Sequence, residues 1–268
     1  MELIGYLASI LIGVSLGLIG SGGSILTVPL LVYLFQVSPL LATTYSLAIV
    51  GLSSIAGVIS RLKQKLVDLK TILVFGAPSI VGVFLARKYL LPAIPEQIIG
   101  GPHFMLTKSH FIMLFFAILM FIAALSMILG KNKEEEEEGS LPVYGFTLML
   151  VGLTEGLLTG IVGAGGGFLI IPALVILAKL PMKKAIASSL VIISIKSLVG
   201  FSGDLLNTAV DWSFLSKIIL LATIGIITGN YLNKKIEGAK LKKGFGFFVL
   251  AMALIIFIEQ FFFSNLIK

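Results

Sequence analysis

Residues 17–34 read GLIGSGGSILTVPLLVYL, and residues 160–177 read GIVGAGGGFLIIPALVIL. The two phrases lie 143 residues apart and share glycines at 20/163, 22/165 and 23/166 and a proline at 29/172. Each phrase places a glycine cluster inside a long apolar run. Irregular backbone at membrane depth is tolerated only where protein buries it or it lines a cavity. A matched pair of glycine-broken segments therefore points to the binding site of a transporter.

The composition around these phrases is that of an integral membrane protein. Of the 268 residues, 57% are hydrophobic and only 12% are charged, whereas soluble domains carry roughly 25% charged residues. The net charge of +7 is scattered between apolar runs, so the distribution of basic residues in membrane proteins explains it better than nucleic-acid binding does. The chain has no cysteine and two histidines, so we expect no disulfide, no metal site and no cofactor.

The apolar runs predict an all-α membrane protein built from two homologous halves. In each half the first run is too long and too interrupted for one helix, and three runs of spanning length follow it. We expect an N-terminal repeat over 1–130, a charged cytoplasmic linker over 131–140 and a C-terminal repeat over 141–268. The runs cover 3–36, 40–60, 70–91, 109–130, 141–179, 182–202, 213–232 and 244–264.

The positions of the basic residues favour an inverted repeat. If each broken run crosses the membrane once, the halves are parallel, and the best arrangement puts 11 basic residues inside and 8 outside, leaving out Lys196 within a span. If each broken run is a hairpin that returns to its own side, the halves are inverted and the split becomes 14 to 5. Because cytoplasmic loops are enriched in Lys and Arg, the re-entrant, inverted arrangement is favoured over the parallel one.

The glycine clusters are the first candidate binding elements. Glycine supplies the positive φ angles that a tight turn requires. The segments that follow, 24–35 and 168–178, look helical, and free N–H groups at a helix N-terminus attract anions. The structural alternative is that the glycines only allow close helix packing. The candidate substrate-binding residues here are Gly20, Gly22, Gly23, Ser24, Gly163, Gly165, Gly166 and Gly167.

Lys196 is the sharpest single candidate, because a cation in the middle of a membrane span is costly and is usually functional. It shares one helix face with Ser189 and Gly200, and the matching face of the first half carries Ser46 and Gly57 without a cation. We expect Lys196, Ser46 and Ser189 to contact an anionic substrate. The alternative for Lys196 is a structural ion pair with a buried carboxylate.

Glu155 is the expected partner of that ion pair. Burial disfavours a charged carboxylate, which would suit proton coupling; the alternative is a position close to water. Hydroxyl groups of Thr43, Thr44 and Ser188 could donate to an oxyanion, or bond within their own helices. Three basic or neutral side chains of the longer loop region are expected at the membrane interface: Arg87, His103 and His110.

The doubled phrase G-x-x-G-x-G-G, with its proline six residues on, resembles the TauE/SafE family of sulfite exporter-like permeases. It stands here as Gly17 to Gly23 with Pro29, and as Gly160 to Gly166 with Pro172. The resemblance covers essentially the whole chain. It implies a secondary carrier of the prokaryotic plasma (inner) membrane whose cargo is a small sulfur-containing anion. It assigns no role to Lys196 or Glu155.

The residues and the resemblance together predict a multi-pass secondary transporter that exports an anion such as sulfite or an organosulfonate by alternating access. An anion channel, or a permease for another small anion or carboxylate, remains the alternative. An enzyme is disfavoured, because no catalytic dyad or metal-ligand cluster occurs within the runs. The expected partners are the lipid bilayer and a small anion. A homo-oligomer stays open, and nucleic acid is not expected.

Overall fold

The computed structural model describes residues 2–100, 105–129, 145–205, 208–233 and 238–260, and nearly all of them are helical. The first half contains α1 (Glu2–Ile19), the 3₁₀ helix η1 (Gly20–Leu26), α2 (Thr27–Tyr33), α3 (Pro39–Lys63), α4 (Leu69–Thr71), η2 (Ile72–Gly76), α5 (Ala77–Leu85), η3 (Ala86–Leu90), α6 (Leu91–Ala93), β1 (Gln97–Gly100), β2 (Met105–Thr107) and α7 (Lys108–Leu129). The second half contains α8 (Gly145–Val162), α9 (Gly167–Ile176), α10 (Met182–Asp204), α11 (Trp212–Asn233) and α12 (Gly238–Ile258).

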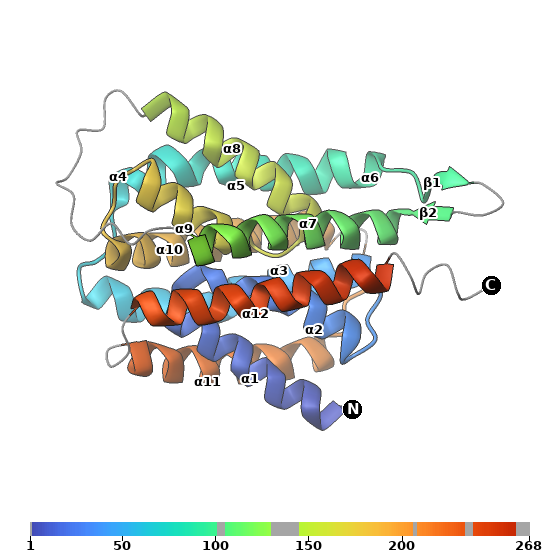
Figure 1. Ribbon diagram of the computed structural model, residues 1–268, viewed down its shortest axis with the longest axis horizontal. Helices are drawn as coiled ribbons and strands as arrows, with labels where there is room; N and C mark the ends of the chain where they lie inside the picture. The colour runs from blue at the N-terminus through green and yellow to red at the C-terminus, as the bar shows by residue number, and fades with distance from the viewer. Residues whose placement is uncertain (1, 101–104, 130–144, 206–207, 234–237, 261–268) are drawn as a thin grey trace.

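The helices lie side by side along the long axis of the molecule (Figure 1). Within the described residues, six helices are long and apolar enough to cross a membrane, counting Leu69–Ala93 as one continuous helix with π-type turns. Outside this bundle, β1 and β2 pair as a short antiparallel hairpin. The expected all-α membrane fold is therefore confirmed. The linker at 131–140 and His103 lie outside the described residues.

Each glycine-broken run folds back on itself, and the two open at opposite ends of the bundle. The ring of Tyr6 in α1 lies 5.4 Å from that of Phe35 just after α2, at the end that carries β1 and β2, here called the β-hairpin end (Figure 1). Leu148 near the start of α8 packs in one cluster with Ala178, just after α9. The start of α8 and the residues just after α9 lie at the opposite end, where α7 ends (Figure 1), here called the linker end.

The helices of the two halves interleave, and their contacts recur at a spacing of 143 residues. In α1, Gly13 packs on the backbone of Ala222 in α11; in α8, Gly156 packs on the backbone of Ser79 in α5. Where α3 meets α10, the Ser194 hydroxyl donates to the Gly51 carbonyl at 3.2 Å, a pair that is itself 143 residues apart. Glycine makes these approaches possible because a Cβ would overlap the facing backbone.

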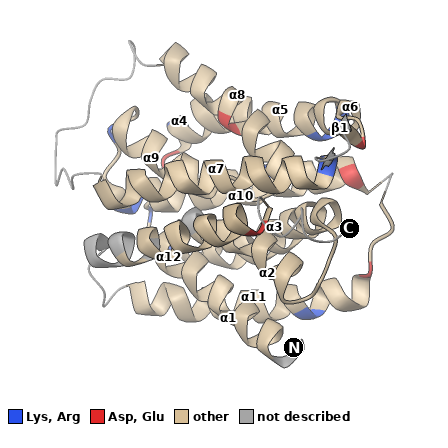
Figure 2. Ribbon diagram, turned by 45° about the vertical axis from the view of Figure 1, so that its right-hand side comes forward, with Lys and Arg blue, Asp and Glu red and all other residues tan. Residues whose placement is uncertain are grey.

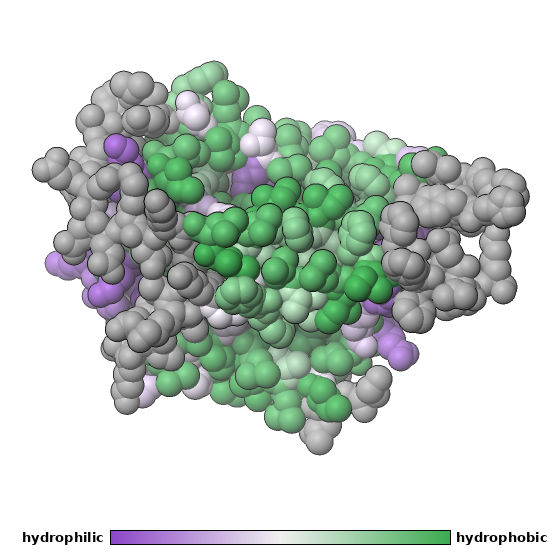
Figure 3. Space-filling view, viewed as in Figure 1, coloured by the Kyte–Doolittle hydropathy of each residue, from purple (hydrophilic) through white to green (hydrophobic). Residues whose placement is uncertain are grey.

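The charges lie mainly towards the two ends of the helices, although α8 carries an acidic segment within the bundle (Figure 2). The visible face of the molecule is hydrophobic across its middle, with hydrophilic residues at both ends (Figure 3). The exposed large hydrophobic residues of the molecule include Leu73, Phe121 and Ile227. A continuous apolar surface of this extent indicates contact with lipid.

Candidate functional site

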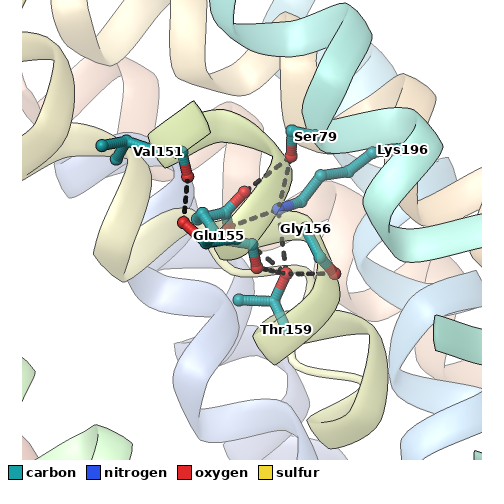
Figure 4. Close-up of polar contacts among 7 residues, drawn as sticks. Ser79, Val151, Glu155, Gly156, Thr159 and Lys196 are labelled. Carbon is teal, nitrogen blue, oxygen red and sulfur yellow. Dashed lines mark hydrogen bonds and ion pairs between the residues drawn. The ribbon is translucent and has the colours of Figure 1, made fainter. Parts of the chain in front are cut away.

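The centre of the bundle holds a buried ion pair between Lys196 and Glu155. Lys196 lies in α10 and is 0% exposed, and its Nζ atom lies 2.5 Å from Oε1 of Glu155 in α8. Figure 4 shows the two side chains pointing toward each other, with Ser79 and Thr159 beside them. The expected partnership of Lys196 and Glu155 is present in the structure.

Two hydroxyl groups complete the bonding of this pair. Ser79 donates to Oε2 of Glu155 at 2.6 Å, and Nζ of Lys196 donates to the hydroxyls of Thr159 at 3.1 Å and Ser79 at 3.4 Å. The hydroxyl of Thr159 donates in turn to the Glu155 carbonyl at 2.8 Å. All three ammonium hydrogens of Lys196 therefore have an acceptor. A fully bonded pair can persist in a dry interior where an isolated charge could not.

The second glycine turn closes over this cluster. Gly163, Gly165 and Gly166 have φ angles of +72°, +66° and +74°, which L-residues with side chains rarely adopt. A Cβ on Gly166 would lie 2.6 Å from Nζ of Lys196 and would overlap Oε1 of Glu155. Helix α9 begins at Gly167, so the Glu155 carboxylate lies at its N-terminus. This is the place where the helix dipole favours a negative charge.

The first glycine turn is built differently from the second. Gly20 has a positive φ there, +73°, whereas Gly23 is not among the glycines with positive φ, and the chain continues as η1. A Cβ on Gly20 would meet Ile186 of α10, whereas Gly23 packs on Ser15 and Leu16 of its own hairpin. Helix α2, with seven residues, is too short to present a strong N-terminal dipole. The two equivalent helix N-termini expected from the sequence are thus unequal.

Arg87 corrects an expectation: it is not interfacial but buried, with its side chain 0% exposed. Its Nη1 atom lies 2.9 Å from Oδ2 of Asp204 and donates to the Thr43 hydroxyl at 3.0 Å. Asp204 also accepts from Thr44 at 2.8 Å. Gly163 lies directly against this group. The second glycine turn is therefore flanked by two buried ion pairs, one at each end.

A helical-spacing signal could have found Arg87 in the sequence. Ser79, Val83 and Arg87 follow one another at intervals of four residues and so share one face of the helix. That face packs on α8 through Ser79 and Val83, which contact Gly156 and Gly160. The neighbouring Lys88 points elsewhere, over the ring of Phe84 at 5.4 Å.

The remaining predicted site residues lie farther from Lys196. The Ser189 hydroxyl donates to the Ile186 carbonyl at 2.9 Å, within its own helix, and Ile186 is the residue that faces Gly20. The Ser46 hydroxyl is buried and has no hydrogen-bond partner among the described residues. Ser188 accepts from the Asp68 backbone N–H at 2.9 Å at the linker end. Ser24 is fully buried in η1, where Gly22 also lies.

The polar cluster has no counterpart in the first half of the chain. Subtracting 143 from Glu155, Thr159 and Lys196 gives Ile12, Leu16 and Ser53, and adding 143 to Ser79 gives Ala222. Ile12 and Leu16 pack in an apolar cluster with Leu30 and Ile226. The two halves therefore differ at the whole cluster and not at the lysine alone, because the positions that correspond to its hydrogen-bonding partners carry other residues too.

Known proteins match the chain over nearly its whole length. The family described as "Sulfite exporter TauE/SafE" matches residues 5–256. A "Probable membrane transporter protein" of Xylella fastidiosa (strain 9a5c) is 29% identical over 249 residues, covering 91% of this chain and 90% of that protein. "Probable membrane transporter protein YunE" of Bacillus subtilis (strain 168) is 26% identical, with coverages of 82% and 84%. No solved structure matches the chain significantly.

Proposed function

The chain belongs to the sulfite exporter TauE/SafE family of multi-pass membrane transporters, and from this premise we propose that it exports a small sulfur-containing anion such as sulfite or an organosulfonate. The family supports transport, not an enzymatic reaction. The observation that carries the choice of an anion is the buried ammonium group of Lys196 in the middle of a spanning helix. A cation at this depth marks a substrate pathway in many membrane proteins.

The proposed substrate site lies between Lys196 and the second glycine turn. Glu155 occupies it in the present conformation, because its carboxylate lies both against the ammonium group and at the N-terminus of α9. A substrate anion would displace that carboxylate and take over the contacts of Lys196 and of the backbone N–H groups after Gly165 and Gly166. The first turn, with Gly20, Gly22, Gly23 and Ser24, and the hydroxyls of Ser46 and Ser189 would line the approach.

Displacement of Glu155 gives a route to proton coupling. A carboxylate that loses its ammonium partner in a dry interior becomes stable only by binding a proton or by moving to water. Proton uptake at Glu155 would then accompany anion binding at Lys196. Because the proton and the anion would cross together, the coupling predicts that an outward-directed proton gradient speeds anion efflux from liposomes containing the wild-type protein and no longer does so with E155Q.

We further propose that the halves 1–130 and 141–268 are inverted repeats with re-entrant hairpins, joined by a cytoplasmic linker in the plasma (inner) membrane. Three observations support this: the hairpins open at opposite ends, the contacts of α1 with α11 recur between α8 and α5, and Gly20–Ile186 recurs as Gly163–Thr43. Alternating access would move each hairpin together with the helix of the other half on which it packs, because glycines allow close backbone contact between the two helices.

The test is uptake by the purified protein in liposomes, with sulfite, sulfoacetate, sulfate, chloride and acetate offered separately. Saturable flux of the sulfur-containing anions, with a KM and a low turnover rate, is the expected result. Single-channel currents would show an anion channel instead. Transport of acetate alone would show a carboxylate permease.

A further inference from the structure

Two buried arginines lie outside the Lys196 cluster, one toward each end of the bundle. Arg87 lies in η3, toward the β-hairpin end, and Arg61 lies in the last turn of α3, at the linker end. Their exposed fractions are 2% and 5%. Each lies against one of the glycine phrases: Arg87 contacts Gly163, and Nη2 of Arg61 donates to the Gly17 carbonyl at 3.3 Å.

The two arginines are bound by residues that correspond to each other at the 143-residue spacing. Arg61 corresponds to Asp204, and Arg87 corresponds to Asn230. In one half the pair is Arg87 with Asp204 at 2.9 Å. In the other it is Arg61 with Asn230, where Nη2 donates to Oδ1 at 3.4 Å. Each pair of corresponding positions thus holds one arginine and one acceptor. In one bonded pair the arginine lies in η3 and the acceptor in α10, and in the other the arginine lies in α3 and the acceptor in α11.

The two places differ in charge. Arg87 has a carboxylate and a hydroxyl as acceptors. Among the described residues, Arg61 has a neutral amide and a carbonyl oxygen as acceptors, both at long hydrogen-bond distances. Within the described ranges, no ion pair includes Arg61. Both arginines keep guanidinium nitrogens without an acceptor among the described residues, Nε in Arg61 and Nε and Nη2 in Arg87, so the two places differ in their counter-charge. A guanidinium group buried without a counter-charge is costly unless an anion binds it.

We propose that Arg61, with Asn230, is a binding site for a small oxyanion at the linker end. In the other half the Asp204 carboxylate neutralises Arg87, as the anion would neutralise Arg61, and a planar guanidinium group suits two oxygens of one oxyanion. Resting on the proposed function, this site captures the substrate on the linker side before it reaches Lys196. At the β-hairpin end Asp204 already supplies the negative charge beside Arg87.

The test changes the acceptor and the cation of the Arg61–Asn230 pair in separate variants. N230D supplies Arg61 with its own carboxylate, and R61Q removes the cation. Sulfite binding is measured by isothermal titration calorimetry of the full-length protein in lipid nanodiscs at low salt, in the K196M/E155Q background, so that the central site does not contribute. We expect sulfite to bind this background, and we expect both N230D and R61Q to weaken the binding at least tenfold. The exposed K63Q variant, at the same end of α3, should stay within twofold.

Unchanged sulfite affinity in both N230D and R61Q would overturn the site, as would the absence of any heat of binding in the background. N230D guards against misfolding, because it adds a partner to a buried charge and should not lower the unfolding temperature. The outcome is separable from the proposed function. If the wild-type protein transports anions but sulfite affinity does not depend on Arg61, only the Arg61 site is rejected. If sulfite binding depends on Arg61 but none of the tested anions is transported, only the proposed transport is rejected.

Discussion

The Nζ atom of Lys196 lies 2.5 Å from Oε1 of Glu155, and neither side chain is more than 4% exposed. The two residues come from α10 and α8, 41 positions apart. Their charges neutralise each other inside an apolar bundle, so the removal of one partner leaves the other uncompensated. Stability and transport must therefore be separated in any test of Lys196.

K196M should lose transport and also lose stability. It leaves a buried carboxylate without its cation, which costs about 3–5 kcal/mol. K196M/E155Q removes both charges and should recover most of that loss while transport stays absent. Thermal unfolding of the detergent-solubilised protein and liposome flux measure the two effects. Wild-type flux in a folded K196M/E155Q protein would remove Lys196 from the substrate path.

G166A should destabilise the protein by at least about 2 kcal/mol, because alanine is strained at positive φ and its methyl group would collide with the Lys196–Glu155 pair. The matched control is G145A, since a Cβ there would have no neighbour within 4 Å. G145A should change the free energy of unfolding by less than about 0.5 kcal/mol. Equal unfolding temperatures for the two variants would contradict the tight fit of the second glycine turn.

S79A should cost about 1.5–3 kcal/mol, the range for losing a hydrogen bond to a charged group. The serine donates to Glu155 at 2.6 Å and accepts from Lys196. The fold itself accepts alanine at this place, since the corresponding residue of the other half is Ala222. S216A, at an exposed position of α11, serves as the control. An S79A protein as stable as S216A would show that Ser79 does not hold the ion pair.

Cysteines at positions 64 and 213 should react from opposite sides of the membrane. The wild-type chain contains no cysteine, and Gln64 and Ser213 are both exposed, between α3 and α4 and at the start of α11. In the inverted arrangement Q64C faces the cytoplasm and S213C faces outward. An impermeant maleimide added to intact cells should label S213C only. Labelling of both from one side would reject the inverted repeat.

Much of the architecture could be predicted because it depends on local properties of the chain. Long apolar runs must form helices in lipid, since every backbone polar group needs an internal partner. The pairing of Lys196 with Glu155 was also predictable, because a deeply buried ammonium group needs a carboxylate and the spans before the C-terminal segment offer few. The contribution of Ser79 and Thr159 was not predictable, because hydroxyl groups are common throughout these helices.

The error at Arg87 shows where local reasoning stops. Arg87 and Lys88 are neighbours near the end of one apolar run, which suggests the same interfacial place for both. The helix turns by about 100° per residue, so the two side chains face different surroundings. Which of them is buried depends on where α8 and α10 pack, and the Asp204 partner lies 117 positions along the chain.

The sequence by itself determined that this is a helical membrane protein with a duplicated glycine phrase and a cation in one span. These features follow from hydropathy, from backbone freedom at glycine and from the cost of a charge in lipid. Only the tertiary structure decided that the halves interleave, that the second glycine turn lies between two buried ion pairs, and that Arg61 has no counter-charge among the described residues. Those facts depend on contacts between residues far apart in the chain, where packing alone selects the partner.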